Sequence, residues 1–199
     1  MYLYGASGHG KVIKEIVESQ GEAIEGFVDD NRNINELGGF PVKHSMEGIG
    51  EVIVSIGLNR IRKMIVEKLN CKFANAAIHA KAVISRTAKI EEGSVVMAGA
   101  IINAEAKIGK HCIINTGSCI DHECKIGDYV HISPHTTLCG NVVVGEGTWI
   151  GAGSVVIPGI KIGRWSQIGA GSIVTKDIPD GWLAYGNPCI IVRQLNENV

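Results

Sequence analysis

Residues 114–138 read INTGSCIDHECKIGDYVHISPHTTL, with an aliphatic residue at every sixth position. The pattern extends in both directions without an insertion, so that all sixteen positions taken in steps of six from Ile84 to Val174 are Ile, Leu or Val. A second register, four residues after each of these positions, holds mostly small residues, among them Ala88, Ser94 and Ala100.

A period of six matches neither the period of a helix nor the simple alternation of a flat strand. It predicts a prism wound from short strands, in which each hexad forms one face, the aliphatic residue fills the interior and the small residue lets the chain bend at a corner. Three hexads make one coil, and successive coils should pair as parallel strands about 4.8 Å apart. This repeat resembles the left-handed parallel β-helix of the hexapeptide-repeat acyltransferases, and that resemblance implies the handedness.

The pattern changes near residue 78, which predicts a Rossmann-like α/β domain over residues 1–77 and a β-helix domain over residues 78–199. The expected order in the first domain is a strand at 1–4, a turn at 5–10, a helix at 11–19, strands at 26–30 and 51–57, and a helix at 59–69. After Val174, residues 177–188 contain many turn residues, so we expect this segment to leave the prism and end in a short tail.

The composition is typical of a soluble globular protein, with 45% hydrophobic and 20% charged residues in a chain of 199. A net charge of -1 gives no basic field that would attract nucleic acid. No apolar run is long enough for membrane insertion, and Met1 leads into Tyr-Leu-Tyr without a charged signal-peptide region, so we expect a cytoplasmic protein. The six cysteines form no C-x-x-C pair and are expected to be reduced thiols.

A glycine-rich segment, Gly5-Ala-Ser-Gly-His-Gly-Lys11, lies between the first predicted strand and helix, where its amides would suit a phosphate group. It approaches a Walker A motif, but Val12 stands where Ser or Thr should hold magnesium, so we exclude an ATPase. Asp29 and Asp30 follow at a strand end, where carboxylates accept hydrogen bonds from a nucleoside in dinucleotide-binding folds. From these residues alone, a tight turn without a ligand and a solvated acidic turn stay open as alternatives.

Three segments carry a more specific resemblance: YGASGHG at residues 4–10, VDD at 28–30 and IGLN at 56–59, all ahead of the hexapeptide repeat. They resemble the bacterial nucleotide-sugar acetyltransferases, which are the UDP-4-amino-sugar N-acetyltransferases of the bacillosamine pathway and the related sialic acid O-acetyltransferase-like proteins. In that family the N-terminal domain holds the UDP-sugar. The resemblance therefore implies that the substrate lies near Ser7, Gly8 and His9, that the nucleotide binds Asp29 and Asp30, and that the pocket is lined by Gly57.

His122 stands in Ile120-Asp-His-Glu-Cys124, with an acidic residue on either side. A carboxylate near an imidazole favours the protonated ring, which suits a general base near neutral pH. One full coil of three hexads separates His122 from Gly140, so the Gly140 amide should lie one strand spacing away, well placed for an oxyanion. The resemblance implies the same roles, with His122 as proton acceptor, Glu123 as the acid that raises its basicity and Gly140 as oxyanion donor.

The resemblance also implies acetyl-CoA as co-substrate. His131 matches a family histidine that contacts acetyl-CoA, and Ala152 and Ala170, in two Gly-Ala-Gly segments one coil apart, match backbone contacts to CoA. The alternative is that these small residues serve only tight corners. His122 and His131 are half a coil apart and should face different sides of the prism, so they can share a site only where two subunits meet. This spacing favours the homotrimer that the resemblance implies.

The expected reaction moves the acetyl group of acetyl-CoA to the amino group, at the 4 position, of a UDP-linked amino sugar, by direct attack with no acyl-enzyme. The nearest alternative is the same chemistry on a hydroxyl group, as in O-acetylation of sialic acid. A remote alternative is a zinc enzyme resembling the γ-class carbonic anhydrases, with nitrogens drawn from His111, His122, His131 and His135. We expect no metal, because the N-terminal domain and the Gly-Ala-Gly coils would have no purpose in that scheme. The last alternative is a nucleotide-sugar sensor without catalytic activity.

Overall fold

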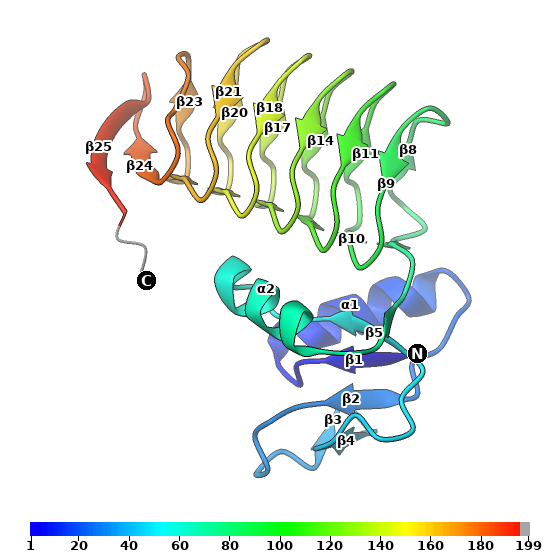
Figure 1. Ribbon diagram of the computed structural model, residues 1–199. Helices are drawn as coiled ribbons and strands as arrows, with labels where there is room; N and C mark the ends of the chain where they lie inside the picture. The colour runs from blue at the N-terminus through cyan, green and yellow to red at the C-terminus, as the bar shows by residue number, and fades with distance from the viewer. Residues whose placement is uncertain (196–199) are drawn as a thin grey trace.

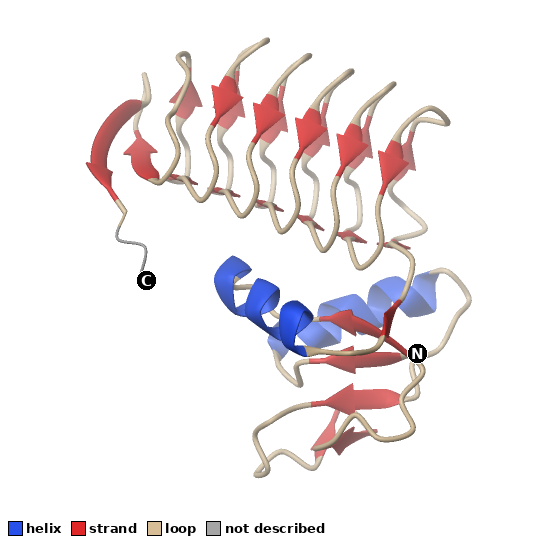
Figure 2. Cartoon of the chain, in the orientation of Figure 1, coloured by secondary structure: helices blue, strands red, loops and turns tan. Residues whose placement is uncertain are grey.

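The computed structural model describes residues 1–195, in which a six-stranded sheet with two helices precedes a three-sided solenoid (Figure 1). Figure 2 shows that both helices of the described residues lie in the N-terminal part and that the solenoid consists of strands and loops. Neither helix is long and apolar enough to cross a membrane. The expected fold class, an α/β region followed by a parallel β-helix, is confirmed.

Strands and helices alternate in the N-terminal part. In chain order they are β1 (Tyr2–Tyr4), α1 (Gly8–Ser19), β2 (Gly26–Val28), β3 (Glu36–Leu37), β4 (Phe40–Lys43), β5 (Glu51–Val54), α2 (Asn59–Lys68) and β6 (Lys72–Phe73). The sheet order is β3-β4-β2-β1-β5-β6, and all neighbours are parallel except β3 and β4, a hairpin that the sequence pattern did not predict. Side chains of β1 alternate between two cores, so that Leu3 packs with α1 and Tyr4 packs with α2.

Helix α1 begins at Gly8, ahead of the predicted start at Lys11. The prediction of a turn up to Gly10 was therefore wrong for residues 8–10. These residues form the first turn of the helix, where backbone amides have no intrahelical acceptor, and not the middle of the helix, where glycine is destabilising. Gly10 is needed for packing, since a Cβ at this position would lie 2.6 Å from the Gly5 carbonyl oxygen and 3.1 Å from the Phe27 ring. The glycine-rich segment therefore forms the first turn of α1 as well as the loop before it.

Each face of the solenoid is a sheet with one strand per coil. The face beside the N-terminal part, called the N-domain face, consists of β7 (Ala77–Ile78), β10 (Val95–Val96), β13 (Ile113–Ile114), β16 (His131–Ile132), β19 (Trp149–Ile150), β22 (Gln167–Ile168), β24 (Trp182–Tyr185) and β25 (Ile190–Gln194). The aliphatic face consists of β8 (Val83–Ile84), β11 (Ile101–Ile102), β14 (Cys119–Ile120), β17 (Thr137–Leu138), β20 (Val155–Val156) and β23 (Ile173–Val174). The lysine face consists of β9 (Lys89–Ile90), β12 (Lys107–Ile108), β15 (Lys125–Ile126), β18 (Val143–Val144) and β21 (Lys161–Ile162).

The interior of the solenoid is filled by the aliphatic residues of the six-residue register. Fourteen of the sixteen are buried, and Ile84 and Ile90 in the first coil are half-buried. Strand partners such as Ile102 and Ile120 are three hexads apart in the sequence, which confirms the predicted coil length. Hydroxyl groups of the small-residue register are satisfied internally; the Ser94 hydroxyl, for example, donates to the Gly109 carbonyl at 2.7 Å.

The segment after Val174 does not leave the solenoid, contrary to the sequence prediction. Ile178 bridges to Ile162, and Leu183 and Ala184 of β24 pair in parallel with β22. These partners are separated by less than three hexads, so the last coil is shorter than the others while its inward residues still fill the core. The six-residue spacing is not kept in this coil, but apolar side chains are still buried in the interior of the solenoid. Strand β25 then turns back antiparallel to β24.

Candidate active site

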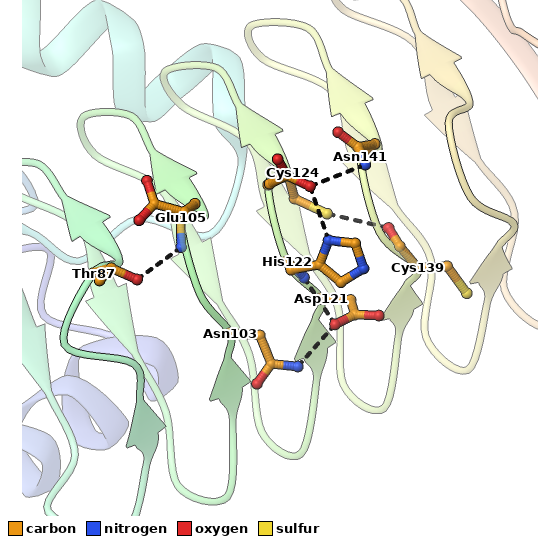
Figure 3. Close-up of polar contacts among 9 residues, drawn as sticks. Thr87, Asn103, Glu105, Asp121, His122, Cys124, Cys139 and Asn141 are labelled. Carbon is orange, nitrogen blue, oxygen red and sulfur yellow. Dashed lines mark hydrogen bonds and ion pairs between the residues drawn. The ribbon is translucent and has the colours of Figure 1, made fainter.

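His122 lies at the corner between the aliphatic and lysine faces, just after β14 (Figure 3). Its backbone amide donates to Asp121 Oδ1 at 2.8 Å, and its Nδ1 lies 3.1 Å from Glu123 Oε2. An ionised carboxylate can only accept a hydrogen bond, so this contact places the imidazole proton on Nδ1 and leaves Nε2 as the basic nitrogen. The side chain is about half exposed, at 53%. The structure thus gives His122 an oriented and accessible base nitrogen.

Two asparagines one coil away hold the acidic neighbours of His122, and the motif around His122 did not reveal them. Asn103 donates to Asp121 Oδ1 at 2.9 Å, and Asn141 donates to Glu123 Oε2 at 3.3 Å. The hydrogen bond from Asn103, together with the one from the His122 amide, holds the pKa of Asp121 below its usual value. The signal that could have found them is the coil register, since Asn103 precedes Asp121 and Asn141 follows Glu123 by one coil.

Gly140 lies against the imidazole of His122. A Cβ built on Gly140 would come within 2.5 Å of Nε2 and 2.6 Å of Cε1, so only glycine leaves room for the ring there. The backbone amide of Gly140 donates to no acceptor within residues 1–195, whereas its carbonyl accepts from Gly159. A base nitrogen and an uncommitted N–H therefore stand side by side, as the register predicted. This is the arrangement needed to take a proton and stabilise an oxyanion at one reacting centre.

His131 lies on the N-domain face and is 8% exposed. Its ring stacks on Trp149 at 5.3 Å, and Asn115 Nδ2 lies 3.2 Å from its Nε2. Burial, and then the nearby charges of Arg62 and His9, lower the pKa of His131 to about 3. The Nδ1 atom is buried and has no partner within the described chain. His131 is therefore neutral near neutral pH, with one nitrogen uncommitted.

Ser7, Gly8 and His9 open helix α1, with Ser7 at its N-cap position. Ser7 and Gly8 are exposed, and a Cβ on Gly8 would meet nothing within 4 Å. Burial, and then the charge of Arg62, lower the pKa of His9 to about 4, and its Nε2 is buried without a partner within residues 1–195. Exposed amides at the positive end of a helix thus stand next to a neutral histidine.

Asp29 and Asp30 follow β2 beside this helix start but differ in their hydrogen-bond partners. Both oxygens of Asp29 accept from backbone amides, Oδ2 from Ala6 at 2.7 Å and Oδ1 from Asn31 at 2.8 Å. Asp30 is exposed and accepts from the Tyr4 hydroxyl at 2.8 Å. Burial, followed by that hydrogen bond, raises the pKa of Tyr4. Asp29 therefore positions the glycine-rich loop, while Asp30 is the more exposed carboxylate, with Lys68 Nζ 3.8 Å from its Oδ2.

The remaining predicted site residues occupy two further places. Gly57 follows β5, with open space around its Cα, and its carbonyl accepts from Arg62 Nη1 at 3.1 Å. Ala152 and Ala170 are exposed, one coil apart, at the corner between the N-domain and aliphatic faces. That corner is the opposite edge of the aliphatic face from His122. Within one chain the structure brings His122 to Gly140 but not to His131, Ala152 or Ala170.

The four histidines considered for zinc do not converge in the described chain. His111 is buried between Phe73 and Tyr129, His131 stacks on Trp149, and His135 lies over Gly117 at another corner. No group of three or more His, Cys, Asp or Glu residues with metal-binding geometry occurs in residues 1–195.

A cavity of about 360 Å³ lies between α2 and the N-domain face. Its lining is mainly apolar and includes Leu58, Ile61, Trp149 and Trp165. Trp149 also stacks on His131, so the wall of the cavity continues to the histidine. The cavity is on a different face from His122 and is separate from the His122–Gly140 pair.

Comparison with known proteins places these features in a family. Residues 1–69 match the model of the PglD N-terminal domain, and residues 105–140 and 141–176 match that of the bacterial transferase hexapeptide repeat. Over 97% of its length the chain is similar to a mutant of perosamine N-acetyltransferase from Caulobacter crescentus, solved with CoA and GDP-perosamine, at 36% identity, 96% coverage of that chain and a TM-score of 0.92. The chain belongs to the hexapeptide-repeat nucleotide-sugar acetyltransferases.

Two further members of this acetyltransferase family resemble the chain. The acetyltransferase domain of PglB from Neisseria gonorrhoeae is 35% identical over 96% of this chain and 98% of that chain, with a TM-score of 0.89. UDP-N-acetylbacillosamine N-acetyltransferase from Bacillus subtilis is 40% identical over 108 residues, which are 48% of this chain. The match spans about half the length of that curated relative, 50%. The family resemblance inferred from the YGASGHG, VDD and IGLN segments and the hexapeptide repeat is confirmed.

Proposed function

We propose that the chain transfers the acetyl group of acetyl-CoA to the 4-amino group of a nucleotide-linked amino sugar, with His122 as general base. The observation that carries this proposal is the contact between His122 Nε2 and Gly140, whose amide is uncommitted within residues 1–195, in a member of this family. Two of the named relatives, from B. subtilis and C. crescentus, are N-acetyltransferases, which favours nitrogen over a hydroxyl as acceptor. Structures of the C. crescentus and N. gonorrhoeae relatives contain CoA or acetyl-CoA.

The reaction proceeds by direct attack. The sugar amine, as a free base, attacks the thioester carbonyl carbon, and His122 Nε2 takes a proton from the nitrogen as the C–N bond forms. The Gly140 amide donates to the oxygen that becomes negatively charged in the tetrahedral intermediate. The C–S bond then breaks, the carbonyl re-forms, and the imidazolium returns its proton to the CoA thiolate. Glu123 accepts a hydrogen bond from the Nδ1–H of His122 throughout and so stabilises the imidazolium.

The sugar nucleotide binds the N-terminal part in this proposal. The exposed start of α1 suits the pyrophosphate, and Asp30 is available to the ribose or base. Gly57 and the uncommitted nitrogens of His9 and His131 line the path towards the sugar. The nucleotide is UDP in our proposal, as in the name of the B. subtilis relative, whereas the C. crescentus relative was solved with GDP-perosamine.

The active unit is a homotrimer in this proposal, packed through the aliphatic face. The N-domain face is covered by the N-terminal part, and the lysine face presents Lys89, Lys107, Lys125 and Lys161. The outward residues of the aliphatic face carry no charge and include Val83 and Ile101, which are 62% and 38% exposed. A threefold axis beside this face brings the His122 corner of one chain to the Ala152 corner of the next, where CoA lies.

The decisive experiment for the reaction incubates the protein with acetyl-CoA and a panel of 4-amino and 3-amino sugars linked to UDP or GDP, together with free sialic acid. Release of CoA thiol measures turnover, and mass spectrometry locates the acetyl group. We expect acetylation of a UDP-4-amino sugar with the highest kcat/KM in the panel. Preference for GDP would correct the base alone, transfer to sialic acid would establish the O-acetyltransferase, and binding without thiol release would establish a sensor.

The shared site can be tested by mixing two inactive variants. His122→Ala removes the base, and Ala152→Trp blocks the CoA path at the other edge of the aliphatic face. If each site takes these residues from different chains, trimers assembled randomly from equal amounts should regain about a quarter of wild-type activity. A site within one chain would give none. Sedimentation of the same mixture verifies that the trimer has formed.

A further inference from the structure

The carbonyl groups at one corner of the solenoid form a column that the solenoid itself leaves unused. His111, Tyr129 and Gly147 are successive members of the corner between the lysine and N-domain faces, one coil apart from each other, and each has a positive φ. Their amides donate to the preceding coil, but no backbone amide of residues 1–195 donates to their carbonyls. Three acceptors therefore point away from the ladder and need donors from elsewhere.

Helix α2 supplies these donors from two residues on one face, Asn59 and Arg62. Arg62 Nε donates to the His111 carbonyl at 2.8 Å, and Nη2 donates to the Tyr129 carbonyl at 2.8 Å. Asn59 Nδ2 donates to the Gly147 carbonyl at 3.1 Å. The two side chains are joined, since Arg62 Nη2 also donates to Asn59 Oδ1 at 2.9 Å. Asn59 and Arg62, neighbours on one face of α2, thus donate hydrogen bonds to three consecutive coils.

Arg62 also bonds to the loop before α2. Its Nη1 donates to the carbonyls of Ile56 and Gly57 at 2.9 Å and 3.1 Å. The side chain is 1% exposed, and no carboxylate of the described residues forms an ion pair with it. Burial lowers its pKa to about 10, so the guanidinium remains charged near neutral pH. A buried cation without a counter-ion is costly unless carbonyl dipoles replace water around it, as they do here.

We propose that Arg62, with Asn59, is a positioning residue for acetyl transfer. It fixes residues 56–58, the Gly57 loop, relative to the solenoid coils that carry the CoA-binding residues, and it thereby fixes the sugar nucleotide relative to CoA. This inference rests on the proposed function. Arg62 touches neither substrate. It sets the distance between two parts of the molecule that each hold one substrate, and a displacement of about 1 Å at a reacting centre can cost on the order of a hundredfold in rate.

The test compares Arg62→Met, Arg62→Lys and Asn59→Ala with Lys63→Met. Lys63 is a matched control because it lies on the same helix and bonds to the same solenoid, through an ion pair with Glu146 at 2.6 Å. Its ammonium lies 5.8 Å from the centre of the Tyr129 ring, but it donates to no carbonyl of the column or of the Gly57 loop. The readout is the ratio of acetyl transfer to acetyl-CoA hydrolysis, measured below each variant's Tm. A merely structural role would lower Tm without changing this ratio.

We expect Arg62→Met to lower the ratio by about tenfold to a hundredfold, to raise KM for the sugar nucleotide and to leave KM for acetyl-CoA unchanged. Arg62→Lys keeps the charge but not the five donors and should rescue little. Asn59→Ala should lower the ratio less, and it decides the question if the Arg62 variants do not fold. Lys63→Met should keep the wild-type ratio. Unchanged ratios in folded Arg62 and Asn59 variants would overturn the proposal.

Hydrogen exchange separates this inference from the proposed function. The amides of residues 55 and 62 flank the Gly57 loop and donate to the Tyr4 and Leu58 carbonyls; they should exchange faster in Arg62→Met and Asn59→Ala than in the wild type or Lys63→Met. This measurement needs no turnover. If the wild type acetylates no amino sugar, the proposed function is wrong. The exchange rates then test independently whether Arg62 holds the loop.

Discussion

A single added methyl group at Gly140 tests the catalytic geometry most directly. In Gly140→Ala the new Cβ would lie 2.5 Å from His122 Nε2, whereas ordinary contacts of a Cβ begin near 3.4 Å. The imidazole must therefore retreat by roughly 1 Å, and a displacement of that size typically costs about a hundredfold in rate. Gly140 has no positive φ and the three atoms nearest to its Cβ all belong to the half-exposed His122 ring, so alanine fits the backbone and the fold should survive. We expect kcat to fall by about a hundredfold, or about 2.7 kcal/mol in activation free energy, with Tm nearly unchanged.

The assay is thiol release from acetyl-CoA at saturating sugar nucleotide, with Tm and CoA affinity measured on the same preparation. Gly50→Ala is the matched control, because Gly50 also has no positive φ and a Cβ there meets nothing within 4 Å. A second comparison places Gly140→Ala in a His122→Ala background. If displacement of the ring causes the loss, the two effects should be far from additive. More than about half of wild-type kcat in Gly140→Ala would refute the reasoning that the position of the His122 ring against Gly140 sets the rate.

Other predictions concern the base, the nucleotide site and the response to acid. His122→Ala should lower kcat by about a hundredfold to ten-thousandfold with little change in Tm, since the side chain is half exposed, and Glu123→Gln should cost less; comparable losses would contradict these roles. Asp30→Ala should raise KM for the sugar nucleotide and not for acetyl-CoA, whereas Asp29→Ala should also lower Tm because two backbone amides lose their acceptor; equal effects on both substrates would count against this. Burial lowers the pKa of His111 to about 4, so the folded state disfavours its protonation, and its contribution to stability is complete above pH 6.5 and is lost as pH falls towards 4. Tm should therefore decline over that range, and His111→Phe should flatten the decline; an identical pH dependence in the variant would exclude this cause.

The solenoid could be predicted from the sequence because its stabilising interaction repeats. Each inward residue of the repeat from Val96 to Val174 occupies an equivalent buried position, so the six-residue spacing alone predicts which residues are buried. The same register predicted the contact between His122 and Gly140, and could have predicted Asn103 and Asn141. The last coil was not predicted because the register assumes a fixed number of residues per coil. The core requires only that an apolar side chain reach the interior again. Ile178 and Ala184 do so after a shorter loop.

The junction between the two parts could not be predicted from periodicity. Arg62 stands among the polar residues of an amphipathic helix, and nothing in its spacing distinguishes it from a solvated arginine. Its burial depends on the corner carbonyls of His111 and Tyr129, which lack partners only because the chain turns there with a positive φ. Such a site arises when two folded surfaces meet. The repeat shows which corner residues lie one coil apart. It does not show that α2 packs against them.

The same reasoning supports our proposal that the catalytic site is shared between two chains. His122 and Gly140 occupy one edge of the aliphatic face, and the exposed Ala152 and Ala170 occupy the other. In the proposed reaction, CoA bound at the second edge must bring its thioester within hydrogen-bond reach of Gly140, and the attacking amine must reach His122, both at the first edge. The intervening surface is uncharged and ends in exposed Ile101 and Val83, so it is better suited to burial than to water. In the proposed trimer, packing this face against neighbouring chains would remove its apolar surface from water and bring the two edges of different chains together, so assembly and catalysis would depend on the same residues.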